Sequence, residues 1–129
     1  MIERARAHWD KALRFLATAR NESDTDVDSA VSRAYYASFH GVSALFALRG
    51  QEFAKHAHIR SALHLHLIKT GEWPTPLGSD YDKLLDLRES GDYGVEMEVD
   101  FDDAVFAVDA AARILEMVRR SHPDIFTEG

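Results

Sequence analysis

The sequence predicts an all-α protein, an up-and-down antiparallel four-helix bundle with an additional short helix. Apolar residues recur at three- and four-residue steps through nearly the whole chain, which is the period of an amphipathic helix. The loops between these segments are short, which favours antiparallel neighbours. At 129 residues the chain has the length of one domain, so we assign residues 1–129 to a single helical domain.

The first two helices are predicted over about residues 2–21 and 27–49. A polar segment at 21–25 separates them, and Asp26 is a suitable N-cap for the second helix, which we expect to end at Gly50. The stripe that predicts the first helix consists of Ile2, Ala5, Trp9, Leu13, Leu16 and Ala19.

A third helix is predicted from about residue 54 to 69, and a short fourth helix from Ser79 or Asp80 to about Ser90. Between them, the two prolines and the glycine of residues 72–78 are expected to exclude a helix. Residues 95–101 alternate apolar and acidic side chains, and we interpret them as an extended connector that places Val95, Met97 and Val99 on the bundle.

The last helix is predicted from Phe101 to Ser121, with Pro123 just beyond its end. Its apolar stripe is the clearest in the chain and is expected to face the core. The stripe consists of Phe101, Ala104, Val105, Val108, Ala111, Ala112, Leu115 and Val118.

The second helix lacks the charged outer face of an ordinary surface helix. One interpretation is that this helix is central and that both of its faces are internal. The other is that the unusual face forms a symmetric homodimer interface, with Arg33 and His40 near the two-fold axis. The face consists of Ser29, Arg33, Tyr36, Ala37, His40, Ala44 and Ala47.

Composition excludes several functional classes. The absence of cysteine excludes disulfide scaffolds, thiolate metal sites and thiol nucleophiles. A net charge of −7 disfavours sequence-independent nucleic-acid binding, so any such role would use the first half of the chain, which is slightly basic. No apolar run approaches a membrane span, and the N-terminus is unlike a signal peptide, so a cytoplasmic location is expected.

Arg33 and His40 are the first candidates for chemistry, because seven residues on a helix place them on one side with Tyr36 between them. Imidazole can exchange a proton with a ribose hydroxyl, and a guanidinium can stabilise phosphoryl charge, as in a ribonuclease. An arginine followed, after four to six residues, by a histidine also occurs at Arg49 and at Arg60, and chance predicts about two such matches in this sequence. The spacing alone therefore carries no weight.

Two further features have competing interpretations. The histidines at positions 56, 58, 64 and 66 suggest a metal site, but alternate residues of a helix point apart, so partly exposed histidines are the favoured reading. Arg88 is nearly alone among acidic residues. It either pairs with Asp92 one turn later or anchors a phosphate or a partner residue.

The run Ser32–His40 (SRAYYASFH), followed by an Ala/Leu-rich stretch to Gly50, resembles the second-helix signature of stand-alone prokaryotic HEPN-domain proteins. His58, the triplet at 69–71 and the run Leu87–Gly94 (LRESGDYG) are similar to later motifs of that family. The resemblance covers about residues 3–120. It implies a helical bundle that commonly forms homodimers.

The same resemblance implies a function class. Many superfamily members are metal-independent ribonucleases in toxin–antitoxin or defence-like modules. Some have a small nucleotidyltransferase as partner, and others are non-catalytic RNA- or nucleotide-binding modules; no cofactor is implied. In this chain Asp92 stands where the catalytic motif has a histidine.

The expected roles follow from that substitution. His40 would act as acid or base, Arg33 and Arg88 would hold phosphate, and Tyr36, Asp92 and Tyr93 would contact substrate. Tyr93 could also accept a nucleotidyl group. The alternative is a non-catalytic dimeric adaptor, in which the same residues form a structural polar network.

Overall fold

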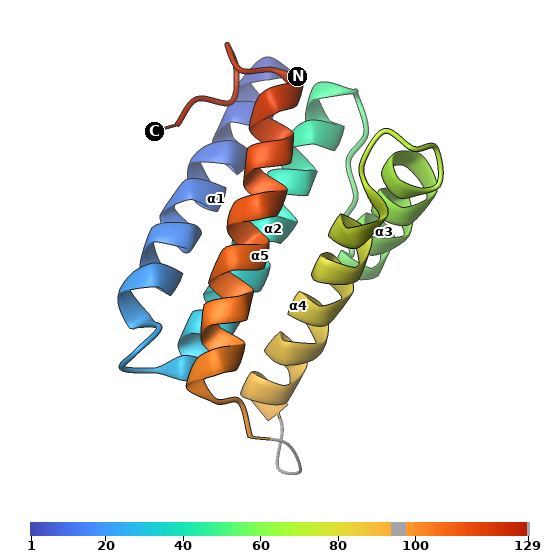
Figure 1. Cartoon of the computed structure of the whole chain (residues 1–129). Coiled ribbons are helices and arrows are strands. Elements are labelled where there is room, and N and C mark those ends of the chain that lie inside the picture. Colours follow the sequence, from blue (N-terminus) through green and yellow to red (C-terminus); the bar gives the residue numbers. More distant parts are fainter. Residues whose placement is uncertain (94–97, 129) are drawn as a thin grey trace.

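The computed structural model describes residues 1–93 and 98–128, apart from the side chains of Asp92 and Tyr93. The four long helices run alternately up and down, and the shorter segments α3 and η1 lie outside them beside α4 (Figure 1). The predicted four-helix bundle with an additional short helix is therefore confirmed. The elements are α1 (Ile2–Glu22), α2 (Val27–Leu48), α3 (His56–Ala62), η1 (Leu63–Ile68), α4 (Thr75–Tyr93) and α5 (Phe101–Ser121).

The boundaries of α2 follow the local signals in the sequence. Asp26 caps the helix, because its Oδ1 accepts the backbone N–H of Ser29 at 3.1 Å. At the other end Gly50 has a φ of +80°, and its N–H donates to the carbonyl of Ala47 at 3.0 Å. This left-handed residue after the helix is a position that favours glycine.

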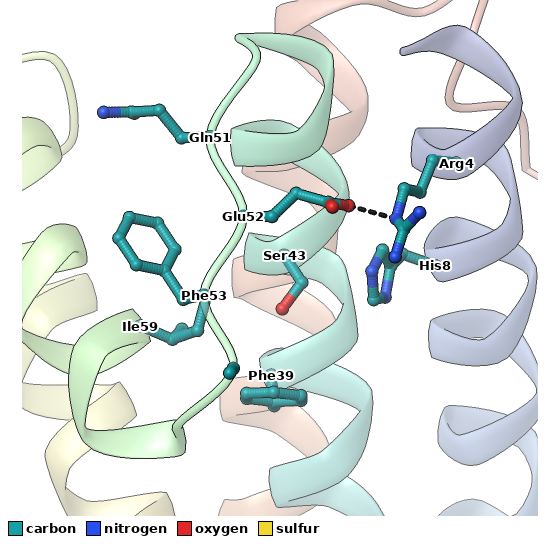
Figure 2. A pocket seen from close by; sticks show the side chains of 9 residues that line it. Arg4, His8, Phe39, Ser43, Gln51, Glu52, Phe53 and Ile59 are labelled. Atoms are coloured by element: carbon teal, nitrogen blue, oxygen red, sulfur yellow. Dashed lines mark ion pairs between the residues drawn. The ribbon is translucent and has the colours of Figure 1, made fainter.

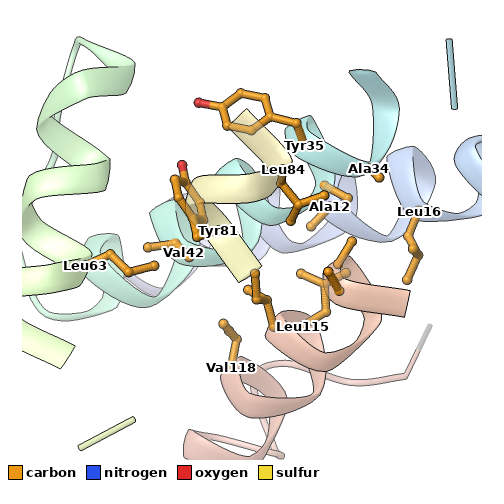
Figure 3. Close-up of a cluster of buried hydrophobic side chains, with 14 of the residues drawn as sticks. Ala12, Leu16, Ala34, Tyr35, Val42, Leu63, Tyr81, Leu84, Leu115 and Val118 are labelled. Atoms are coloured by element: carbon orange, nitrogen blue, oxygen red, sulfur yellow. The ribbon is translucent and has the colours of Figure 1, made fainter. Parts of the chain in front are cut away.

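α2 is the central element, in contact with α1, α4 and α5. Its small residues are buried on both sides, among them Ala34, Ala37 and Ala44. Gly41 permits the closest approach, because a Cβ there would lie 2.3 Å from the side chain of Leu115 on α5. Of the two interpretations of this helix, the one in which neighbouring helices cover both faces is confirmed for these small residues, and the homodimer interface stays a prediction. Figure 3 shows the core that α2 shares with α4 and α5.

The third predicted helix begins at His56 rather than at residue 54, and its second half is the π-helical segment η1. The wider turns appear in the hydrogen bond from the Lys69 N–H to the carbonyl of His64, 2.8 Å long and five residues apart. η1 packs closely on α4, since a Cβ at Gly78 would lie 2.9 Å from Cε1 of His64.

The prediction that residues 72–78 exclude a helix is wrong for their second half. α4 begins at Thr75, four residues before the expected cap at Ser79 or Asp80, and it extends to Tyr93. Pro76 lies in the first turn, where a helix needs no N–H donor, so the ring is tolerated there. Asp80 forms no cap; its carboxylate accepts two hydrogen bonds from Arg113 of α5, at 3.0 and 3.2 Å.

α5 has the predicted bounds, and the reciprocal hydrogen bonds of Asp100 and Asp103 cap its first turn. The prediction that the whole apolar stripe faces the core is wrong for Phe101 and Val105, which are 53% and 39% exposed. The buried sector of α5 consists of Ala104, Ala107, Ala110, Ala111, Ile114, Leu115 and Val118. Of the predicted connector, Val99 is buried, whereas Val95 and Met97 lie outside the described residues. No helix in the described part of the chain could cross a membrane.

Candidate functional site

Eight aromatic, imidazole and guanidinium side chains form a continuous cluster where α1, α2, α3 and α4 meet. α2 contributes four of them within two helical turns, α1 two, and α3 and α4 one each. All eight are buried or half-buried. We call this group the histidine–tyrosine cluster. It consists of His8, Phe15, Tyr35, Tyr36, Phe39, His40, His56 and Arg88.

Arg88 connects α4 to the tyrosines of α2. Its Nη2 donates a hydrogen bond to the hydroxyl oxygen of Tyr36 at 2.9 Å. The guanidinium carbon lies 5.3 Å from the ring centre of Tyr36 and 5.6 Å from that of Tyr35. These distances are in the range of cation–π contacts, so two rings fix the position of the positive charge.

His56, the first residue of α3, lies at the same two tyrosines. Its Nδ1 is 3.0 Å from the hydroxyl oxygen of Tyr35, and its ring stacks on Phe39 at a centroid distance of 4.0 Å. Burial lowers the pKa of His56 below its ordinary value of 6.5, and the charge of Arg88 lowers it further. At neutral pH the imidazole is therefore uncharged and can accept a proton.

His40 is paired with His8 across α1 and α2. Their Nδ1 atoms are 3.1 Å apart, so one ring donates the hydrogen bond and the other, which accepts it, is neutral. Burial lowers the pKa of His40 to about 4, with further contributions from His8 and Lys11. Burial also lowers the pKa of His8.

Phe15 of α1 brings three predicted residues together. Its ring lies 5.5 Å from that of His40, nearly parallel to it, and 5.7 Å from that of Tyr36. The guanidinium of Arg33 lies 5.8 Å from the same ring centre. Arg33 itself is exposed, so its charge is available to a ligand at the edge of the cluster.

The structure thus places Arg33, Tyr36, His40 and Arg88 in one region, although their roles stay predictions. Arg88 contacts Tyr35 and Tyr36 and lowers the pKa of His56. The rings of His8, Phe15 and Phe39 lie against that of His40. Asp92 and Tyr93 belong to the last turn of α4, and their side chains lie outside the described residues, as does the expected pairing of Arg88 with Asp92.

Sequence reasoning missed His8 and His56 as members of this cluster. His56 does follow Arg49 at the ribonuclease-like spacing, but it is Arg88, 32 positions later in the chain, whose charge acts on it. His8 carries no local signal at all, since it occupies an ordinary position on the first helix. Only the packing of α1 and α3 against α2 reveals these two imidazoles.

The other histidines and acidic residues have different surroundings. His58 and His66 are exposed, and His64 forms a bond of 2.9 Å with Asp82, which also accepts one from Arg60 at 2.8 Å. Within residues 1–93 and 98–128, no three His, Asp or Glu side chains are grouped so that they could hold a metal ion.

Comparisons with known proteins agree with this architecture. Residues 5–121 match the sequence profile of the HEPN domain family. The chain is also similar to the UPF0332 protein of Thermotoga maritima. Their identity is 32% over 122 residues, which cover 95% of this chain and 88% of that protein.

Proposed function

The chain belongs to the HEPN domain family, and on that premise we propose that it binds RNA and cleaves it without a metal ion, as part of a toxin–antitoxin or defence-like module. The observation that supports this proposal is the arrangement of a cation and a neutral imidazole, Arg88 and His56, around Tyr35 and Tyr36. RNA transesterification requires a group that removes the proton of the 2′-hydroxyl and a cation that stabilises the negative charge on the phosphoryl oxygens.

In the proposed reaction His56 is the general base. In the tautomer that donates Nδ1–H to Tyr35, the Nε2 lone pair takes the proton of a ribose 2′-hydroxyl. The 2′-oxygen then bonds to the adjacent phosphorus, the bond to the 5′-oxygen breaks, and that oxygen takes a proton from water. The hydroxide that remains takes the proton from His56, which returns the imidazole to its neutral form. Arg88 and Arg33 counter the negative charge on the phosphoryl oxygens. The products are a 2′,3′-cyclic phosphate and a 5′-hydroxyl.

His40 takes a different place in this scheme from the one predicted. With a pKa of about 4 it is neutral at pH 7, so it cannot donate the proton that the leaving oxygen needs. Its bond to His8 and its stacking on Phe15 instead hold the α1–α2 side of the cluster in place. We assign His40 as a positioning residue.

The test is cleavage of a mixed-sequence single-stranded RNA in excess EDTA, with His56→Ala, Arg88→Ala and a control, His66→Ala. His66 is exposed on η1, away from the cluster. Loss of a general base or of a phosphate-binding cation lowers the rate by about 100-fold or more, whereas the control keeps the wild-type rate. Wild-type cleavage no faster than that of His56→Ala would remove the enzymatic proposal.

The hydrogen bonds within the cluster favour a second candidate, a non-catalytic dimeric adaptor that partners a small nucleotidyltransferase. Three contacts connect its polar groups in pairs: Arg88 with Tyr36, Tyr35 with His56, and His8 with His40. Such pairing suits a structural network. This candidate predicts a dimer by light scattering at tens of micromolar. It also predicts a tyrosine mass shift when the chain is incubated with ATP and a minimal nucleotidyltransferase from the same genome. A monomer without that shift argues against it.

A further inference from the structure

A pocket with a volume of about 360 Å³ opens beside the histidine–tyrosine cluster, between the N-terminal half of α1, α2 and the segment at 51–54. In Figure 2, Arg4 and His8 of α1, Ser43 of α2 and Glu52 of the connecting segment lie on one side of that segment, whereas the side chains of Gln51 and Phe53 point to its other side. Its volume lies near the lower end of the range of small-ligand sites, which suits one nucleoside-sized group. The lining residues that matter here are Arg4, His8, Phe39, Ser43, Glu52 and Phe53.

The pocket shares two of its walls with the cluster. Phe39 lines it and stacks on His56, and His8 lines it and is bonded to His40. A group bound in the pocket is therefore one side chain away from each of these two imidazoles. For a nucleotide this arrangement would put the base in the pocket and its sugar and phosphate beside the cluster.

The walls of the pocket offer both a stacking surface and a polar edge. Phe39 contributes an aromatic ring of the kind on which nucleobases stack. Glu52 forms an ion pair with Arg4, and in Figure 2 this pair closes the side of the pocket nearest α1, with Ser43 between Glu52 and Phe39. The negative charge of Glu52 also acts on His8, where it opposes the larger effect of burial on the pKa.

A carboxylate such as that of Glu52 distinguishes guanine from adenine by the hydrogen bonds that it can accept. An ionised carboxylate accepts only, through two oxygens, and Arg4 orients it while leaving lone pairs free on both. Guanine presents two adjacent donors, N1–H and the 2-amino group, which match two carboxylate oxygens. Adenine presents its N1 lone pair beside a single donor, so one oxygen would face another acceptor, which is unfavourable.

We propose that this pocket binds the guanine base of a substrate nucleotide, with Glu52 accepting from N1–H and the 2-amino group and Phe39 stacking on the ring. The inference rests on the proposed function, because it assigns the base preference of the same site. It predicts preferential cleavage at phosphates adjacent to guanosine.

The test measures binding first and cleavage second. Titration calorimetry of the full chain with guanosine and adenosine 5′-monophosphates should give at least ten-fold tighter binding of the guanosine nucleotide. Glu52→Gln should abolish that preference, because an amide presents one acceptor and one donor. The matched control is Glu72→Gln, since Glu72 is also a largely exposed carboxylate paired with an arginine, Arg49, but lies outside this pocket.

The outcomes separate this inference from the proposed function. Equal binding of both nucleotides, or a guanine preference that survives Glu52→Gln, overturns the assignment of the pocket even when RNA is cleaved. A guanine preference that depends on Glu52, in a chain that cleaves no RNA, supports the pocket and removes only the enzymatic proposal. Cleavage mapped on the mixed-sequence RNA then adds an independent check, because sites without guanosine should be cut at least ten-fold more slowly.

Discussion

Acidification should destabilise the fold through His40, and the structure gives the direction and size of this effect. The groups that act on the His40 ring are His8, Lys11, His56 and Arg14, and all are basic. None of these groups stabilises an imidazolium, and burial already penalises it. The pKa of His40 therefore falls from 6.5 in the unfolded chain to about 4 in the folded one.

Proton linkage gives the direction in which the stability of the fold changes with pH. Between pH 6.5 and about pH 4 the unfolded chain binds more protons at residue 40 than the folded chain, so stability falls as the pH falls through this window. The contribution levels off below the folded pKa. The full difference in pKa corresponds to a change of about 3 kcal/mol in the free energy of unfolding. Water around the partly exposed ring reduces this contribution, so we expect about 1–2 kcal/mol.

Urea unfolding followed by circular dichroism measures this contribution at pH 7.5, 6.5, 5.5 and 4.5. The comparison uses the wild type, His40→Gln and His58→Gln, the last being an exposed histidine outside the cluster. Because other groups also titrate, the difference in pH dependence between variants is the quantity to compare. On acidification, the free energy of unfolding of His40→Gln should fall by about 1–2 kcal/mol less than that of the wild type. A pH dependence as steep as that of the wild type would refute the reasoning.

Three further perturbations test the packing and the backbone. Gly41→Val should lower the free energy of unfolding by about 2 kcal/mol in urea titrations, because its side chain would collide with Leu115 of α5. Gly71→Ala should cost about 1 kcal/mol in the same assay through its φ of +81° alone, since no atom lies within 4 Å of the new methyl group. Trp9→Phe removes the 2.7 Å hydrogen bond from Nε1 to the carbonyl of Thr127, so limited proteolysis should cut the C-terminal tail faster than in the wild type.

The sequence was sufficient for the features that depend on local chemistry. The cap at Asp26 and the left-handed glycine at position 50 set the ends of α2 through contacts within a few residues. The sequence mispredicts the start of α4, because proline generally breaks a helix, whereas the first turn of α4 accommodates Pro76. The periodicity places Phe101 on the apolar face, but it does not show how much of that face a neighbouring helix covers, and Phe101 is exposed.

The candidate site was predictable only in part, for a different physical reason. Arg33, Tyr36 and His40 could be found because they lie on one helix, where the spacing fixes their relative positions. The contacts of Arg88 with Tyr36 and of His56 with Tyr35 join residues 52 and 21 positions apart. Such contacts depend on how the helices pack, and no local pattern in the sequence encodes them.

The arrangement of partners around α2 has a consequence for how such a protein can diversify. Three polar side chains of this central helix contact three different segments: His40 contacts His8 of α1, Tyr35 contacts His56 of α3, and Tyr36 contacts Arg88 of α4. A substitution at His8, His56 or Arg88 therefore changes one of these contacts, while the packing of α2 in the core is kept. In a relative that keeps α2, such a substitution would leave the other two contacts in place.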